Sequence, residues 1–418
     1  MTDKFHFQCI NCGKTYSPAE VQYFCPECEK ENSSKSPPKG VLKTIYNFEN
    51  IIKSVLKPDS IEKPVGFPEL DFFDLLPLFD KRCFPLLKIG QTPLYKTNSL
   101  RGENLPFDIF LKDDSQNPTF SFKDRASAVV SAYAKENEIK TIVTASTGNA
   151  GSSIAGICAS QQQKAIVFVP ASAPQAKLTQ IVMYGATIIP VDGTYDDAFD
   201  LSIEASKHYG FYNRNTAYNP LTIEGKKTVS FEIALEMNFS LPDRVFVPVG
   251  DGVIISGVYK GFEDLLKIGL INKMPVIVAV QAKGSDNLTR NIFAEEFISK
   301  PSRTIADSIA VDIPRNFYMA SAYIKEYHGE FITVSDNEIL DASVLLSNEK
   351  GIFTEPASAA AYAGLIKYIE NHKFEDKSKN LVLLTGSGLK DLTSIQSKIE
   401  IPKAIKPCID EIEKIIKH

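Results

Sequence analysis

Short, continuously apolar runs alternate with helical segments through most of this chain, and this alternation constrains the fold more than any other feature of the sequence. The runs are TIVTAST, KAIVFVP, ATIIPVD, RVFVPVG, PVIVAVQ and NLVLLTGSG. Strands that are apolar along their whole length are buried on both faces, which is typical of parallel sheets covered by helices. The sequence therefore predicts an α/β fold with parallel-type sheets.

Length and charge narrow the class of partner. The 418 residues are enough for two or three domains. There are 46 basic and 51 acidic side chains, and no long run of one sign stands out, which argues against nucleic acid or an anionic membrane as partner. No apolar stretch has the length of a signal peptide core or of a membrane span. We expect a cytoplasmic protein that binds small molecules.

Four of the seven cysteines, Cys9, Cys12, Cys25 and Cys28, form two CxxC pairs near the N-terminus. Two such turns can present four thiolates tetrahedrally, so they predict a structural Zn²⁺ in a zinc ribbon; redox-active or unmetallated thiols are the alternative. The polar, Pro-rich stretch KENSSKSPPKG follows and is typical of a linker, so the expected module with its linker covers residues 1–40. A site closed by four sulfurs would stabilise the module and would not catalyse.

Several loops at predicted strand ends carry glycine and small hydroxyl residues. STGNAGSS (146–153) and PVGDGVIISG (248–257) each follow a strand and open a helix, where backbone N–H groups can bind an anion. GIFTEPASAA and TGSGLKD add further small polar residues near such ends. In open α/β sheets the ligand lies at the carboxyl ends of the strands, so these loops are the predicted site.

A fifth motif, NPTFSFKDRAS, contains Lys123. In this order, and with GQTPLYK before them, the motifs resemble the pyridoxal-phosphate enzymes of the threonine synthase group, which have the tryptophan synthase β-like fold (fold type II). The resemblance runs from about residue 90 to about 395. It implies a large cofactor-binding domain (41–129 and 216–418), a small mobile domain (130–215) and a homodimer.

The resemblance also implies the roles of individual residues. Lys123 would hold pyridoxal 5'-phosphate covalently and then move the protons of the substrate; for the residue alone, a solvated lysine is the alternative. Thr385 would face the pyridine nitrogen, where a hydroxyl favours elimination over transamination, and Glu355 would lie near the ring. The implied cofactor contacts are Lys123, Phe122, Asn149, Gly250, Asp251, Gly252, Val253, Ile254 and Thr385. The implied substrate contacts are Ser146, Thr147, Gly148 and Asn149. We further expect Lys177, Thr216 and Asn219 to contact the substrate as the lining of a small anion site that would suit sulfite.

One segment departs from the family pattern. Threonine synthases carry a serine and an arginine that grip the substrate phosphate, whereas NTAYNPLTIEGKKT has Ala217 and Thr222 at those positions. A bidentate phosphate clamp is therefore lost. Lys226 or Lys227 could still contact an anion, and Arg315 is either a substrate contact or a surface arginine.

This departure favours a β-replacement on a seryl-type amino acid, in which O-phospho-L-serine and sulfite give L-cysteate and phosphate, as in cysteate synthases. The first alternative is threonine synthase, which converts O-phosphohomoserine and water to threonine and phosphate. The second alternative is a serine or threonine ammonia-lyase. A catalytically inactive scaffold is a fourth reading, but Lys123, Asn149 and Thr385 argue against it.

Overall fold

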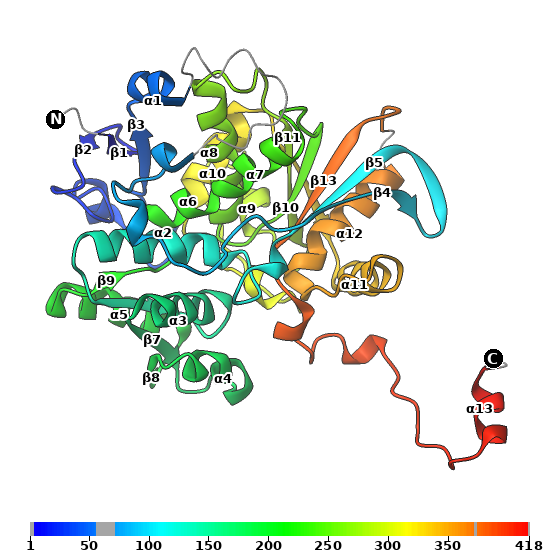
Figure 1. The fold of residues 1–418 in the computed structure, drawn as a ribbon. Helices are drawn as coiled ribbons and strands as arrows, with labels where there is room; N and C mark the ends of the chain where they lie inside the picture. The colour runs from blue at the N-terminus through cyan, green and yellow to red at the C-terminus, as the bar shows by residue number, and fades with distance from the viewer. Residues whose placement is uncertain (1–3, 56–71, 372–373, 417–418) are drawn as a thin grey trace.

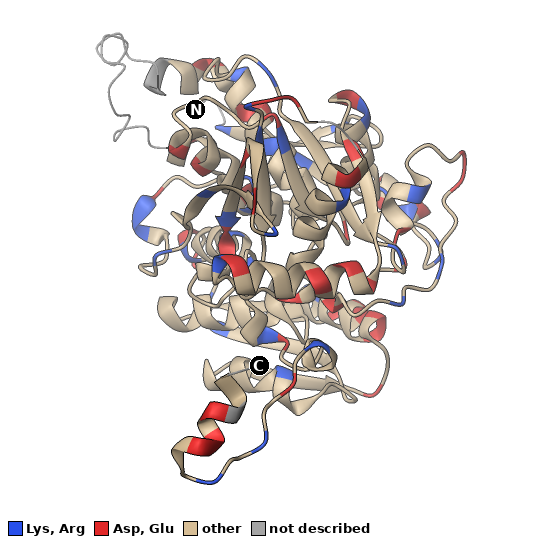
Figure 2. Cartoon of the chain, turned by 90° about the vertical axis from the view of Figure 1, so that its right-hand side faces the viewer, with Lys and Arg blue, Asp and Glu red and all other residues tan. Residues whose placement is uncertain are grey.

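Three β-sheets and the helices that pack on them make up the described part of the chain. The computed structural model describes residues 4–55, 72–371 and 374–416 (Figure 1). Within these ranges no helix combines the length and the apolar character that crossing a membrane requires. Basic and acidic residues are interspersed over the face drawn in Figure 2, as expected from the near balance of charge in the sequence.

The smallest sheet is antiparallel, with the strand order β2-β1-β3, and lies at the N-terminus. Its strands are β1 (Phe5–Cys9), β2 (Thr15–Tyr16) and β3 (Leu42–Tyr46). β3 pairs with β1 along its whole length, so this module extends past the boundary expected at residue 40. The intervening linker is not a free spacer: the side chain of Asn32 accepts from Lys39 N and donates to Lys39 O, at 2.7 and 3.1 Å.

The six-stranded sheet is parallel except for its edge strand β4, as expected for an α/β fold. Helix α12 packs on one face and α8 on the other, with α11 against α12 and α10 against α8. The strands in sheet order are β12 (Glu330–Val334), β11 (Val276–Ala282), β10 (Arg244–Pro248), β13 (Lys379–Leu384), β5 (Glu103–Asp113) and β4 (Leu94–Leu100). The helices are α7 (Thr228–Glu236), α8 (Val253–Lys267), α9 (Asn287–Asn291), α10 (Phe317–Glu326), α11 (Asp336–Lys350) and α12 (Pro356–Asn371).

The four-stranded sheet is fully parallel and falls within the segment expected to form the small domain. Helix α3 packs against β6 and β7, while α5 contacts β6, β7 and β9. The strands in sheet order are β8 (Thr187–Val191), β7 (Lys164–Pro170), β6 (Thr141–Ala145) and β9 (Tyr212–Asn213). The helices are α3 (Asn149–Gln161), α4 (Gln175–Met183) and α5 (Tyr195–Tyr209).

Two helices join these parts. α2 (Lys123–Glu136) packs against α3 and also against α6 (Leu221–Lys226), and α6 in turn packs against α8. At the termini, α1 (Phe48–Val55) follows the N-terminal sheet, and α13 (Ile409–Ile416) ends an extended segment that leads away from the rest of the chain in Figure 1. Short 3-10 turns complete the structure at Cys28–Glu31, Phe72–Leu75, Lys81–Cys83, Asp114–Gln116, Asp307–Ile309, Gly388–Lys390 and Gln396–Lys398.

A buried ionic cluster lies between α6 and α8. Lys227 is bonded to Glu224 and, at 2.8 Å, to Asp264, and Asp264 also accepts from Lys260. Tyr46 donates to Glu224 at 2.5 Å, which ties the N-terminal sheet to the same cluster. Each charge in the cluster has a partner of opposite sign, as a buried charge requires.

We expect Asp264→Ala to lower the free energy of unfolding by about 3–5 kcal/mol, because it leaves Lys260 without its carboxylate and Lys227 with only Glu224. Denaturant unfolding of the purified variant measures this. The control is Asp341→Ala, which removes an exposed ion pair with Lys398 and should cost less than about 1 kcal/mol. An equal decrease in the free energy of unfolding for the two variants would show that the buried cluster stabilises the fold no more than an exposed ion pair does.

Candidate active site

Three loops meet beside Lys123. Isolated β-bridges join Ser121 to Gly386 and Thr354 to Ser387. The backbone N–H of Phe122 donates to the carbonyl of Thr385 at 2.8 Å. The motifs SFKDR, TEPASAA and TGSG, far apart in the sequence, are thereby brought to one place.

Lys123 is the first residue of α2 and is partly exposed, while Phe122 before it is fully buried. Burial lowers the pKa of the Lys123 amine, and the positive charge of Arg214 lowers it further; Glu355 and Asp251 act in the opposite direction. A lowered pKa leaves more of the amine neutral and nucleophilic near neutral pH. This is the property that a lysine needs to hold a carbonyl cofactor.

Asn149 and Glu355 connect the two halves of the site. The Asn149 amide donates to both oxygens of Glu355, at 2.9 and 3.0 Å, from the first turn of α3 to the segment before α12. Burial raises the pKa of Glu355, and the hydrogen bonds from Asn149 partly offset that rise. The sequence placed both residues near the cofactor ring.

The residues expected to hold a substrate carboxylate lie directly before α3. Gly148 N donates to the Ser146 hydroxyl at 3.2 Å, and this bond closes the turn. Gly151 is required here because a Cβ atom at that position would lie 2.3 Å from Ser146 O. The N–H groups of the first helical turn are then free to bind an anion that approaches Ser146, Thr147 and Gly148.

A second anion-binding loop begins at Gly250 and leads into α8 at Val253 and Ile254. Gly252 has a φ of +85°, and a Cβ atom on Gly250 would lie 2.8 Å from the Cα of Ile309, so both positions need glycine. The Asp251 carboxylate turns to the backbone N–H of Arg315, 3.1 Å away. It therefore caps the segment before α10.

Three expected substrate contacts have partners within the protein. Lys177 is half-exposed and forms an ion pair with Asp307 at 2.7 Å. Asn219 is buried; its amide donates to Asn213 O and its oxygen accepts from Leu221 N. Thr216 accepts from Arg214 at 2.9 Å. Their assignment as substrate contacts stays a prediction.

Thr222, at the position of the phosphate-clamp arginine, and Arg315 both have partners within the protein. The Thr222 hydroxyl donates to Asn219 O at 2.8 Å, so it points along its own helix turn. Arg315 binds Asp196 of α5, and its guanidinium carbon lies 4.2 Å from the centre of the Phe199 ring. Arg315 and Lys177 thus both form ion pairs between the 307–316 segment and the helices of the four-stranded sheet.

The structure adds cations that the motif comparison did not single out. Arg214 directly follows β9 and is fully buried, and Lys390 donates to Ser152 at 2.8 Å and to Gln180. Burial lowers the pKa of Lys390 to about 8. Two adjacent lysines were proposed as anion contacts. Lys227 forms ion pairs with Glu224 and Asp264, whereas Lys226 Nζ has no hydrogen-bond partner among the described residues.

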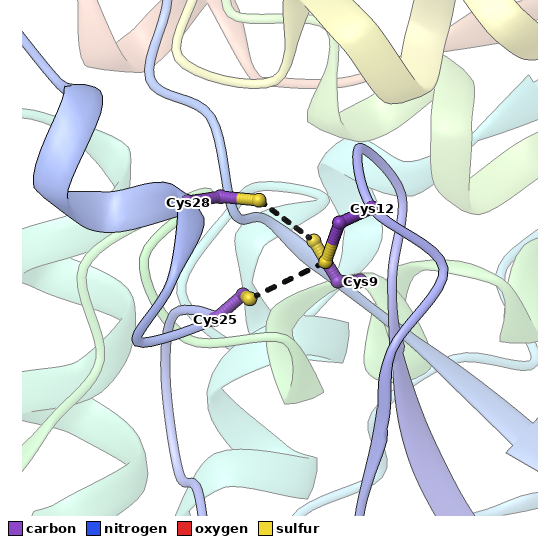
Figure 3. Close-up of side chains that lie close together, drawn as sticks. All are labelled: Cys9, Cys12, Cys25 and Cys28. Carbon is purple, nitrogen blue, oxygen red and sulfur yellow. Dashed lines mark hydrogen bonds between the residues drawn. The ribbon is translucent and has the colours of Figure 1, made fainter.

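A separate cluster holds the four N-terminal cysteines. All four sulfur atoms lie within 4.8 Å of one another, with Cys9 to Cys28 at 3.8 Å and Cys12 to Cys25 at 3.7 Å (Figure 3). A tetrahedral zinc ion with bonds of about 2.3 Å requires sulfurs separated by about 3.8 Å. The donor set is thus compatible with a zinc ribbon.

This chain is similar to known proteins over most of its length. A family model described as "Pyridoxal-phosphate dependent enzyme" matches residues 86–386. The threonine synthase of Methanocaldococcus jannaschii is 35% identical over 415 residues, which cover 98% of this chain and 99% of that protein. The threonine synthase of Methanosarcina acetivorans is 32% identical over 417 residues, covering 99% and 98%.

Solved structures support the fold. The processed form of threonine deaminase isoform 2 from Solanum lycopersicum superposes with a TM-score of 0.61 at 23% identity, covering 70% of this chain and 80% of that one. Maize serine racemase gives 0.63 at 24% identity, covering 74% and 92%. The fold predicted from the sequence is confirmed.

Lys123→Ala should abolish covalent attachment of pyridoxal phosphate, because the amine that forms the bond is removed. Borohydride trapping followed by peptide mass spectrometry measures the attachment site. Lys135→Ala is the control: Lys135 lies at the other end of α2, donates to Gln161, and should leave the label in place. A label on Lys390, whose pKa is also lowered, would contradict the assignment.

Proposed function

This chain belongs to the pyridoxal-phosphate-dependent enzyme family, and on that premise we propose that it is a threonine synthase, which converts O-phosphohomoserine and water into threonine and phosphate. One observation carries the proposal: the likeness to proteins named threonine synthase runs over 98% of this chain and 99% of the M. jannaschii protein. The whole chain, including its N-terminal cysteine module, is thus covered by the comparison.

The residues present fit the cofactor. Bound pyridoxal phosphate supplies an electron sink for carbanions formed next to an amino group. Lys123 Nζ would hold it and then transfer protons at the substrate carbons, which its lowered pKa favours. The loop from Gly250 to Ile254 would bind the cofactor phosphate through backbone N–H groups, and Asn149 would orient the ring.

The substrate would bind on the side of the four-stranded sheet. Its carboxylate would accept from the N–H groups of the turn at Ser146–Gly148. The ion pairs Lys177–Asp307 and Arg315–Asp196 would hold α4 and α5 against the 307–316 segment and so keep the substrate enclosed. Opening and closing of this kind is a common step in enzymes that enclose their substrate.

The β-replacement with O-phosphoserine and sulfite is the second candidate. It is favoured by one observation: Thr222, where threonine synthases have an arginine, is bonded to Asn219 O and offers no phosphate clamp. The full-length likeness to threonine synthases argues for the first candidate, because it covers the whole chain and not one position.

We expect the cofactor-loaded enzyme to release phosphate from O-phosphohomoserine and to form an equal amount of threonine, with no change when sulfite is added. Inorganic phosphate is measured colorimetrically and the amino acid by mass spectrometry. Lys123→Ala is the inactive control. Release from O-phosphoserine alone, increased by sulfite and accompanied by cysteate, would contradict threonine synthase and establish the second candidate.

We further propose that Cys9, Cys12, Cys25 and Cys28 bind one structural zinc ion. The support is the sulfur geometry, and the absence of an open ligand position gives the ion no catalytic role. The cysteine module lies against the part of the chain that holds the four-stranded sheet. There the Tyr23 ring stacks on the Tyr218 ring at a centroid distance of 4.5 Å. Zinc would thus stabilise the module that contacts Tyr218, which lies between the expected substrate contacts Thr216 and Asn219.

Cys12→Ser should abolish stoichiometric zinc binding and lower the thermal unfolding temperature, because three thiolates hold the ion less tightly than four. Metal analysis of the purified chain gives the stoichiometry. Cys83→Ser is the matched control and should retain zinc, since Cys83 lies outside the cluster. Full zinc content in Cys12→Ser would exclude this site.

A further inference from the structure

Two cations in the interior each have a nitrogen without a partner among the described residues. Arg214 and Lys226 are both 0% exposed. Arg214 donates from Nε to Ser127 at 3.2 Å and from Nη1 to Thr216 at 2.9 Å, but its Nη2 has no hydrogen-bond partner. Lys226 Nζ, at the end of α6, has none either.

Other buried cations of this chain show what is missing. Arg125 binds Asp114 and Glu232, and Lys112 binds Glu232 and Glu236. Lys227 and Lys260 share Asp264. Burying a charge is costly without an opposite charge, and the chain provides one for each of these four residues. Arg214 and Lys226 are therefore the exceptions, and a counter-anion from outside the chain would complete them.

The two cations act electrostatically on each other and on Lys123. Burial lowers the pKa of Lys226 well below its usual value, and the positive charges of Lys123 and Arg214 lower it further. Burial likewise lowers the pKa of Arg214 to about 10. Lys226 also packs against α8, the helix that follows the Gly250 loop, because a Cβ atom on Gly257 would lie 2.6 Å from Lys226 Cβ.

The nearby carboxylates do not pair with either cation. Asp124 accepts from the backbone N–H and the hydroxyl of Thr119, at 2.7 and 2.5 Å. Asp251 accepts from Arg315 N at 3.1 Å. The remaining acid beside Lys123, Glu355, is bonded to Asn149. The positive charge around Lys226 is thus left for a ligand.

We propose that Arg214 and Lys226 form the binding pocket for a phosphomonoester and take over the role of the arginine that is absent at Thr222. A guanidinium fork and an ammonium group are the usual ligands of a phosphate dianion. Two bound molecules carry such a group: the amino-acid substrate, whose identity rests on the proposed function, and the cofactor. The Gly250 loop already offers the cofactor phosphate a site, which favours the substrate phosphate as the occupant.

The test uses the holoenzyme with Arg214→Gln and Lys226→Met, and with Lys164→Gln as a control at an exposed lysine at the start of β7. Binding of O-phosphohomoserine and of homoserine is followed by the change in cofactor absorbance. Retention of the cofactor is measured by equilibrium dialysis. We expect each variant to weaken O-phosphohomoserine binding at least about tenfold, with homoserine binding and cofactor retention unchanged.

The other outcomes are equally decisive. If both variants instead lose the cofactor, the pocket binds a phosphomonoester as proposed, and that of pyridoxal phosphate is the source. If O-phosphohomoserine and homoserine are weakened equally and the cofactor is retained, or if nothing changes, the proposal is overturned. These measurements do not need turnover, so they remain valid if the enzyme forms no threonine.

Loss of folding is separated from loss of the pocket by a conservative variant. Arg214→Lys keeps a positive charge without the planar fork and should bind O-phosphohomoserine with an affinity between those of the natural enzyme and Arg214→Gln. Inorganic phosphate is the second probe. It should raise the unfolding temperature of the cofactor-free full chain more than it raises that of either neutralised variant, at matched ionic strength. Equal stabilisation of all forms would overturn the pocket.

Discussion

The packing of α6 between α2 and α8 fixes the relative positions of Lys123, the loop at Gly250 and Lys226. Three glycines permit it: a Cβ atom would lie 2.1 Å from Arg125 O at Gly225, 2.6 Å from Lys226 Cβ at Gly257 and 2.3 Å from Lys227 O at Gly261. No side chain fits at such separations, so the helices pack backbone against backbone. α2 begins with Lys123, α8 follows the loop at Gly250, and α6 ends with Lys226, so this one contact positions the Lys123 amine, that loop and the unpaired cation.

Charge neutralisation separates the supporting framework from the site. Lys227 and Lys226 are neighbours in the sequence and both are fully buried, yet the first is bonded to Glu224 and Asp264 and the second to no described group. Paired buried charges hold a structure in one arrangement, whereas an unpaired one is costly until it loses its proton or binds an anion. At the end of α6, a lysine without a partner and a lysine with two partners are thus consecutive residues.

The sequence was sufficient to predict the fold, and the structure brings several of its motifs together. Buried parallel strands produce continuous apolar runs, and Lys123, Glu355 and Thr385 fall in segments that the structure joins by backbone contacts. The N-terminal sheet extends past the boundary expected at residue 40, because β3 pairs with β1, a long-range pairing that composition does not reveal. Arg214 was missed because it precedes the motif, and Lys226 could not be separated from Lys227 because pairing depends on Asp264, which lies on another helix.

The N-terminal sheet contacts the helices that position Lys226. Tyr46 of β3 donates to Glu224, which also binds Lys227, one residue after Lys226. Lys43 of the same strand binds Glu263, the neighbour of Asp264 on α8, at 2.8 Å. Burial lowers the pKa of Lys43, and the carboxylate of Glu263 opposes that decrease. The sheet that carries Cys9 therefore supports α6 and α8 through Tyr46 and Lys43, so the position of Lys226 depends on contacts made by the N-terminal module.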